Sequence, residues 1–83
     1  MRLVLIEWLD SYGGSGGWKA LEDCTPDPLL CRSVGWLLHD TEQYKVLVPH
    51  LVEPGVETRI AAQGRGDLAI PCAAIVSVRE LVA

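Results

Sequence analysis

The stretch that decides the fold reads Asp67-Leu68-Ala69-Ile70-Pro71-Cys72-Ala73-Ala74-Ile75-Val76-Ser77-Val78. A short apolar strand is followed by a proline, which cannot donate a hydrogen bond to a sheet and therefore ends the strand. The three small residues that come next leave room for one tight turn, and the β-branched run after them predicts a final strand. This end of the chain therefore predicts a strand, a turn and a strand in a small all-β fold.

The rest of the chain contains further apolar runs of strand length, separated by glycine, proline and polar residues. The strands expected from these runs are Arg2–Leu9, Leu29–His39, Tyr44–Val48, Thr58–Gln63, Leu68–Ile70 and Ala74–Val82. Between them, the sequence predicts one helical turn or a short edge strand at Trp18–Asp23, a surface loop at Leu51–Glu57 and a tight turn at Gly64–Asp67. Many short strands with little helix indicate a small barrel or sandwich, formed by one domain over residues 1–83.

The order strand, proline, 3₁₀ turn and last strand resembles the closing segment of SH3-like and Sm-like small barrels. In this resemblance, the glycine-rich segment Asp10–Gly17 corresponds to the long loop after the first strand. The expected fold is therefore mainly all-β, a five- to six-stranded, partly open β-barrel with at most one short helical turn. The fold by itself predicts no function.

Length and charge narrow the class of partner. With 83 residues, 49% of them hydrophobic and 22% charged, the chain has the composition of a folded domain. A domain of this size buries only about 60% of the surface of its unfolded chain, so we expect association into a homo-oligomer. The net charge of −4 makes nucleic acid an unfavourable partner.

The N-terminal apolar run and the cysteines predict the compartment. The run Leu3–Ile6 is too short for a signal peptide or a membrane helix, so we expect a cytoplasmic protein without a membrane segment. The three cysteines, Cys24, Cys31 and Cys72, match neither a disulfide framework nor a zinc site. Thiols in a reducing cytoplasm are the main interpretation, and a Cys24–Cys31 disulfide or a redox role is the alternative.

Four residues are the candidates for ligand binding: Tyr12, Trp18, Lys19 and Arg65. The indole of Trp18 and the ring of Tyr12 offer stacking surface beside a glycine-rich loop, which favours a ring-containing ligand. Lys19 and Arg65 supply cations that bind phosphate or carboxylate, and Arg65 is expected at the tip of a turn. A nucleotide phosphate loop is not matched, because Trp18 separates Gly17 from Lys19 and no hydroxyl residue follows the lysine.

Catalysis and metal binding have no motif in this sequence. No nucleophile, carboxylate pair or set of metal ligands stands at a telling spacing, so we predict no enzyme activity, no catalytic residue, no metal and no cofactor. An acidic patch at Glu22, Asp23 and Asp27 would instead favour contact with a basic protein surface.

Several short motifs, spread over nearly the whole chain, resemble a family of short, mostly uncharacterised phage and prophage proteins. These motifs are Trp8-x-Asp10-Ser11, Gly17-Trp18, Ser33-Val34-Gly35-Trp36-Leu37-Leu38, Pro49-His50 and Ile70-Pro71-x3-Ile75. The resemblance implies an accessory binding protein made in the cytoplasm of a bacterial host cell. It would counter a host defence or regulatory system, either by sequestering a small nucleotide signal or by blocking a host protein. The alternatives are a structural, morphogenetic phage component and an Sm-like nucleic-acid-binding module.

Overall fold

Strands account for more than half of the residues described by the structure, a computed structural model. It describes the chain except residues 12, 14–15, 25–26, 56, 58 and 83. The elements in chain order are β1 (Leu3–Asp10), η1 (Leu21–Asp23), β2 (Leu29–Asp40), β3 (Tyr44–Val48), β4 (His50–Val52), β5 (Gln63–Arg65), β6 (Leu68–Pro71), η2 (Cys72–Ala74) and β7 (Ile75–Glu80). Both η elements are single 3₁₀ turns, and the described residues contain no α-helix.

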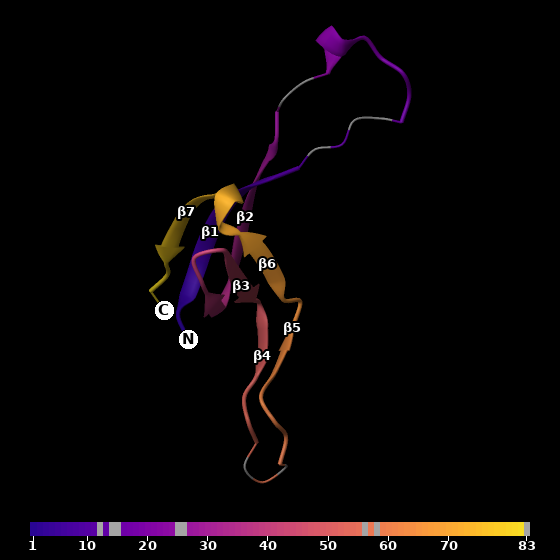
Figure 1. Ribbon diagram of the computed structural model, residues 1–83. Coiled ribbons are helices and arrows are strands. Elements are labelled where there is room, and N and C mark those ends of the chain that lie inside the picture. The colour runs from indigo at the N-terminus through magenta and orange to yellow at the C-terminus, as the bar shows by residue number, and fades with distance from the viewer. Residues whose placement is uncertain (12, 14–15, 25–26, 56, 58, 83) are drawn as a thin grey trace.

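Five strands form one antiparallel sheet in the order β6-β3-β2-β1-β7 (Figure 1). The expected tight turn after Pro71 is the 3₁₀ turn η2, which links the two edge strands, β6 and β7. Among the described residues these two edge strands do not pair with each other, so the sheet stays open. The prediction of a small, mainly all-β, partly open fold is confirmed. A separate two-stranded ribbon, β4-β5, is inserted between β3 and β6.

The core lies on one face of the five-stranded sheet and is small. Its buried side chains are Val4, Ile6, Leu37, Leu47 and Ile70, and the partly buried Trp8 and Ile75 pack against them. Because successive side chains of a strand point to opposite faces, β1 contributes its even-numbered residues and β2 its odd-numbered ones. The opposite face of β2 carries Leu30, Val34 and Leu38, each about half exposed.

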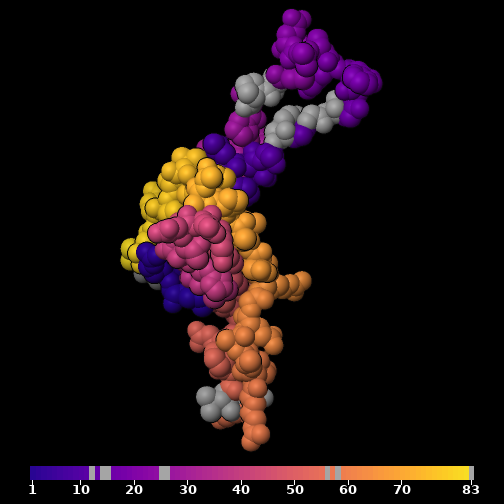
Figure 2. Space-filling view, viewed as in Figure 1, coloured from indigo at the N-terminus to yellow at the C-terminus, as the bar shows by residue number. Residues whose placement is uncertain are grey.

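Two arms project from opposite ends of this sheet (Figures 1 and 2). The first arm connects β1 to β2, and its described outer part is residues 16–24. The second arm is the β4-β5 ribbon with its connection. The molecule measures 62 × 25 × 23 Å and has a radius of gyration of 17.4 Å, whereas a compact domain of this length has about 12 Å. The chain therefore has an elongated shape.

The second arm differs from the sequence prediction. The expected loop at Leu51–Glu57 begins as part of a strand, because β4 covers His50–Val52 and pairs with β5. The strand expected at Thr58–Gln63 is displaced toward the C-terminus, to Gln63–Arg65, and position 58 lies outside the described residues. Gly64 lies in β5 and packs closely on Val48: a Cβ atom there would lie 2.8 Å from Cγ1 of Val48, so a larger residue would require a shift. The turn is confined to Gly66 and Asp67.

The two ends of the chain lie side by side on the sheet, away from both arms (Figure 1). The backbone N–H of Leu81 donates a hydrogen bond of 2.8 Å to the carbonyl oxygen of Leu3, so the last residues pair with the first strand. No helix within the described residues is long and apolar enough to cross a membrane.

Candidate functional site

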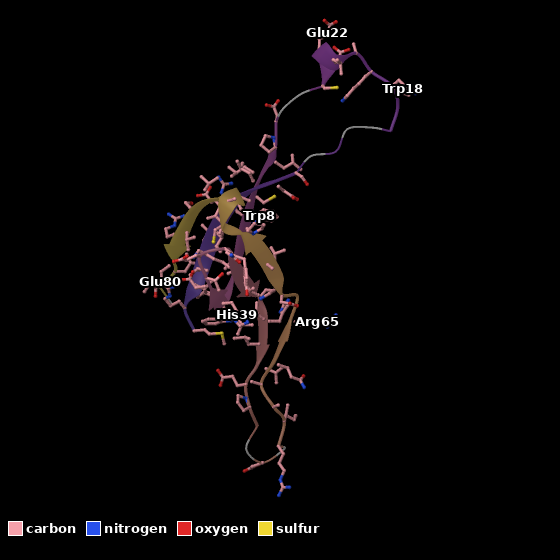
Figure 3. The ribbon with its side chains drawn as sticks, viewed as in Figure 1. Trp8, Trp18, Glu22, His39, Arg65 and Glu80 are labelled. Carbon is pink, nitrogen blue, oxygen red and sulfur yellow. The ribbon has the colours of Figure 1, made fainter. Side chains whose placement is uncertain are left out.

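The predicted ligand-binding residues that the structure describes, Trp18, Lys19 and Arg65, do not lie together within a single chain. Trp18 and Lys19 lie on the first arm, and Trp18 is near its outer end (Figure 3). Arg65 lies on the other side of the sheet, where the second arm begins, and Tyr12 is outside the described residues. Arg65 is the last residue of β5 and pairs with His50, so it stands in a strand and not at the tip of a turn.

The outer end of the first arm presents apolar side chains to solvent. The indole of Trp18 is fully exposed, where sequence reasoning expected a half-exposed platform, and Leu21 is 90% exposed. The 3₁₀ turn η1 fixes the backbone here: the N–H of Asp23 donates to the carbonyl of Ala20 at 3.0 Å, and the N–H of Cys24 donates to that of Leu21 at 3.1 Å. The exposed carboxylates of Glu22 and Asp23 follow directly. This tip combines two apolar anchors with negative charge.

The base of the second arm forms a groove of about 310 Å³, which we call the ribbon groove. Its lining residues are His50, Leu51, Val52, Gln63, Gly64 and Arg65. Because His50 and Arg65 are direct cross-strand partners, their side chains lie on the same face of the ribbon, beside those of Val52 and Gln63. Sequence reasoning named Arg65 but missed His50. The signal available for His50 was its place at the start of a short alternating run after Pro49.

A second, smaller groove of about 240 Å³ lies where β3 leaves β2. It is lined by Ser33, Val34, Leu47, Pro49, Gly66 and Leu68, and we call it the sheet-end groove. Gly66 has a positive φ of 77°, a conformation that favours glycine, and a Cβ there would lie 3.2 Å from the ring of Pro49. The groove is mainly apolar, so it offers packing surface and no strong ligand for an ion.

The charged groups of the sheet serve to hold strands together. Asp40, at the end of β2, forms ion pairs with Lys45 and, at 3.2 Å, with Arg2. The hydrogen bond from Lys45 is the main reason that the pKa of the Asp40 carboxyl lies below its ordinary value, and Arg2 adds to the effect. On β1, Glu7 accepts hydrogen bonds from Arg32 on one side and from Ser77 on the other, both at 3.2 Å. These contacts link neighbouring strands across the sheet.

The indole of Trp8 has a structural partner, and the cysteines do not pair. The indole N–H of Trp8 donates to Oγ of Ser33 at 3.0 Å, which satisfies a half-buried donor. Cys24, Cys31 and Cys72 are free thiols, so the alternative Cys24–Cys31 disulfide is not formed. Within the part of the chain that the structure describes, no group of three or more His, Cys, Asp or Glu side chains could hold a metal ion.

The fold and these surfaces define a class: a small all-β protein with an open antiparallel sheet and two projecting arms. No family model, curated protein or solved structure matches the chain.

Proposed function

We propose that this chain is a non-enzymatic binding protein that recognises another protein through the tip of its first arm and blocks it. The observation that carries the proposal is the full exposure of Trp18, with Leu21 exposed beside it, at the outer end of a 62 Å molecule. Large apolar side chains that project in this way are typical anchors of protein interfaces, where aromatic residues supply much of the binding energy.

The charge at the tip indicates the kind of surface that would receive it. Glu22 and Asp23 directly follow Leu21, and Lys19 is the one cation among the described residues of the tip. A basic rim around an apolar pocket would complement this pattern and would accelerate the encounter at low salt. With the bacterial setting that the phage resemblance implies, the partner would be a host defence or regulatory protein.

A paired comparison of variants tests the proposal. The double variant Trp18→Ser/Leu21→Ser should fold and melt like the wild type, because the hydrogen bonds of the tip stay within the arm. When both forms are purified from bacterial cells, the wild type should retain a protein partner in fixed stoichiometry, and the double variant should lose it.

Charge provides the second half of this test. Glu22→Gln/Asp23→Asn should weaken binding of the same partner, and the loss should be largest at low ionic strength. The proposed role of the arm would be contradicted if the wild type and the Trp18/Leu21 variant retained the same amount of the protein partner. It would also be contradicted if binding of the partner changed neither with salt nor with either pair of substitutions.

The ribbon groove supports a second candidate function, the sequestration of a small nucleotide. Arg65 and His50 place a guanidinium and an imidazole on one face of the ribbon, next to Val52. This combination suits a phosphate joined to a ring system. Calorimetric titration with a panel of nucleotides should then show binding that Arg65→Ala abolishes. Arg59→Ala, on the same arm but outside the groove, is the matched control. Heat of binding with the Arg65 variant equal to that of the wild type would exclude this candidate.

A further inference from the structure

The strand β2 has an open edge along more than half of its length. It pairs with β1 from Leu29 to Trp36, but with β3 only from Trp36 to Asp40. Among the described residues, no strand pairs with the other side of Leu29–Gly35. This open edge of β2 lies next to the sheet-end groove, of which Ser33 and Val34 form one wall.

The direction of the backbone groups follows from the pairing with β1. The N–H of Leu37 donates to the carbonyl oxygen of Arg2 at 2.8 Å, so the odd-numbered residues of β2 hydrogen-bond toward β1. In an antiparallel ladder the alternate residues face the other way, so the N–H and C=O groups of Leu30, Arg32 and Val34 point to the open edge. The structure shows no hydrogen bond from another described residue to these groups. Such a row of unpaired groups is a template for an added strand.

The other edges of the sheet carry features that discourage pairing. The edge strand β6 has only four residues and ends in Pro71, and β7 ends in the charged pair Arg79 and Glu80, with a register shift against β1 between Glu7 and Trp8. Between Leu29 and Gly35 the β2 edge has no proline and no register shift, and Arg32 is its one charged residue. On the face opposite the core, its side chains include Leu30 and Val34, each 51% exposed.

The exposed area favours a second copy of this chain as the occupant. The chain exposes 6727 Å², about 1,800 Å² more than the roughly 4,900 Å² typical of a compact monomer of its mass. A standard interface buries about 800 Å² on each partner, which is less than this excess, although the excess includes the surface of both arms. The small core gives the same indication, because a domain this small gains stability from association.

We propose that two copies of the chain pair through the open edge of β2, antiparallel about a two-fold axis at Arg32. In this register, all three residues whose backbone groups point to the open edge pair with the second copy. Leu30 pairs with Val34 of the second copy, Arg32 with Arg32, and Val34 with Leu30. About six backbone hydrogen bonds then form across the axis. The two guanidinium groups tolerate their proximity because each Arg32 is already paired with Glu7 at 3.2 Å.

The pairing also relates the two arms. Leu29 of each copy comes to lie near Gly35 of the other, beside its Pro49 and sheet-end groove. The first arm precedes Leu29 in the chain, so each arm leaves the dimer along the side of the other copy that carries Arg65. This inference stands independently of the proposed function, although it would give the assembly two arms for one partner.

The oligomeric state of the wild type and of edge variants tests the proposed pairing through β2. Sedimentation velocity or native mass spectrometry should find the wild type as a dimer and Val34→Lys as a monomer, because a charged side chain at an edge blocks strand addition. Val78→Lys, on the exposed part of β7, is the matched control and should remain dimeric. Circular dichroism checks that each variant is folded. A monomeric wild type, or dissociation by Val78→Lys with Val34→Lys unaffected, would overturn the proposal.

Cross-linking tests the register with substitutions at exposed positions. In a background with Cys24, Cys31 and Cys72 replaced by serine, Arg32→Cys should form a disulfide-linked dimer on mild oxidation. Val34→Cys should not, because residue 34 faces residue 30 of the other copy and its own counterpart lies too far away for a disulfide. Cross-linking of Val34→Cys as fast as Arg32→Cys, or of neither, would exclude this pairing. Dimers broken only by substitutions in the first arm would point to arm exchange and would equally exclude it.

Discussion

The backbone of β3 passes close to β2 at Gly35, a residue without a side chain. A Cβ at this position would lie 3.1 Å from both the carbonyl carbon and the carbonyl oxygen of Val48. Because backbone atoms cannot move aside as the end of a side chain can, β3 would have to shift. We therefore expect Gly35→Ala to lower the free energy of unfolding by about 1–3 kcal/mol in chemical denaturation. Gly16→Ala, where nothing lies within 4 Å, should leave it nearly unchanged. Equal effects of the two would show that β3 adjusts freely.

The neighbours Leu37 and Leu38 test which face of β2 holds the core. Leu37 is 7% exposed and belongs to the core, whereas Leu38 is 46% exposed on the opposite face. Leu37→Ala should cost about 2–5 kcal/mol of unfolding free energy because it leaves a cavity. Leu38→Ala should cost less than about 1 kcal/mol. Denaturant titration of both variants measures the difference, and a larger loss at Leu38 would mean that the outer face is the covered one.

At the scale of elements, Asp40 connects the end of β2 to Arg2, which precedes β1, and to Lys45 of β3. These partners hold the pKa of its carboxyl below the ordinary value of 3.8 in the folded chain. A lowered pKa stabilises the folded state above the unfolded value, and this contribution is lost as the pH falls through the folded value. The melting temperature of the wild type should therefore exceed that of Asp40→Asn at neutral pH, and the two should converge below pH 3.8.

The control for this pH dependence is a carboxylate with the same charge and no such partners. Asp23→Asn changes the net charge equally, but Asp23 takes part in none of the ion pairs between described residues. Its melting curve should follow that of the wild type across the acid range. A difference in melting temperature between the wild type and Asp40→Asn that stays constant down to strongly acidic pH would contradict the role assigned to Asp40.

At the scale of the whole molecule, the sheet was predictable and the arms were not. The pattern at residues 67–78 and the alternation within β2 depend on local chemistry, and both appear in the structure. The direction of the first arm has no local signal, because its glycines allow many paths. In the second arm, Gly64 packs against Val48, a contact between residues far apart in the sequence that no local pattern indicates. The described residues of the predicted site, Trp18, Lys19 and Arg65, therefore lie on separate arms.

The pairing of Leu81 with Leu3 brings both chain ends to one place on the sheet, while the arms extend in other directions. A short linker could therefore join the original ends, and new ends could be opened in the connection of the second arm without cutting the five-stranded sheet. Chain-end proximity of this kind is the usual condition for circular permutation and for insertion into a host domain. Another protein can therefore carry this chain through a single attachment point while both of its arms remain accessible.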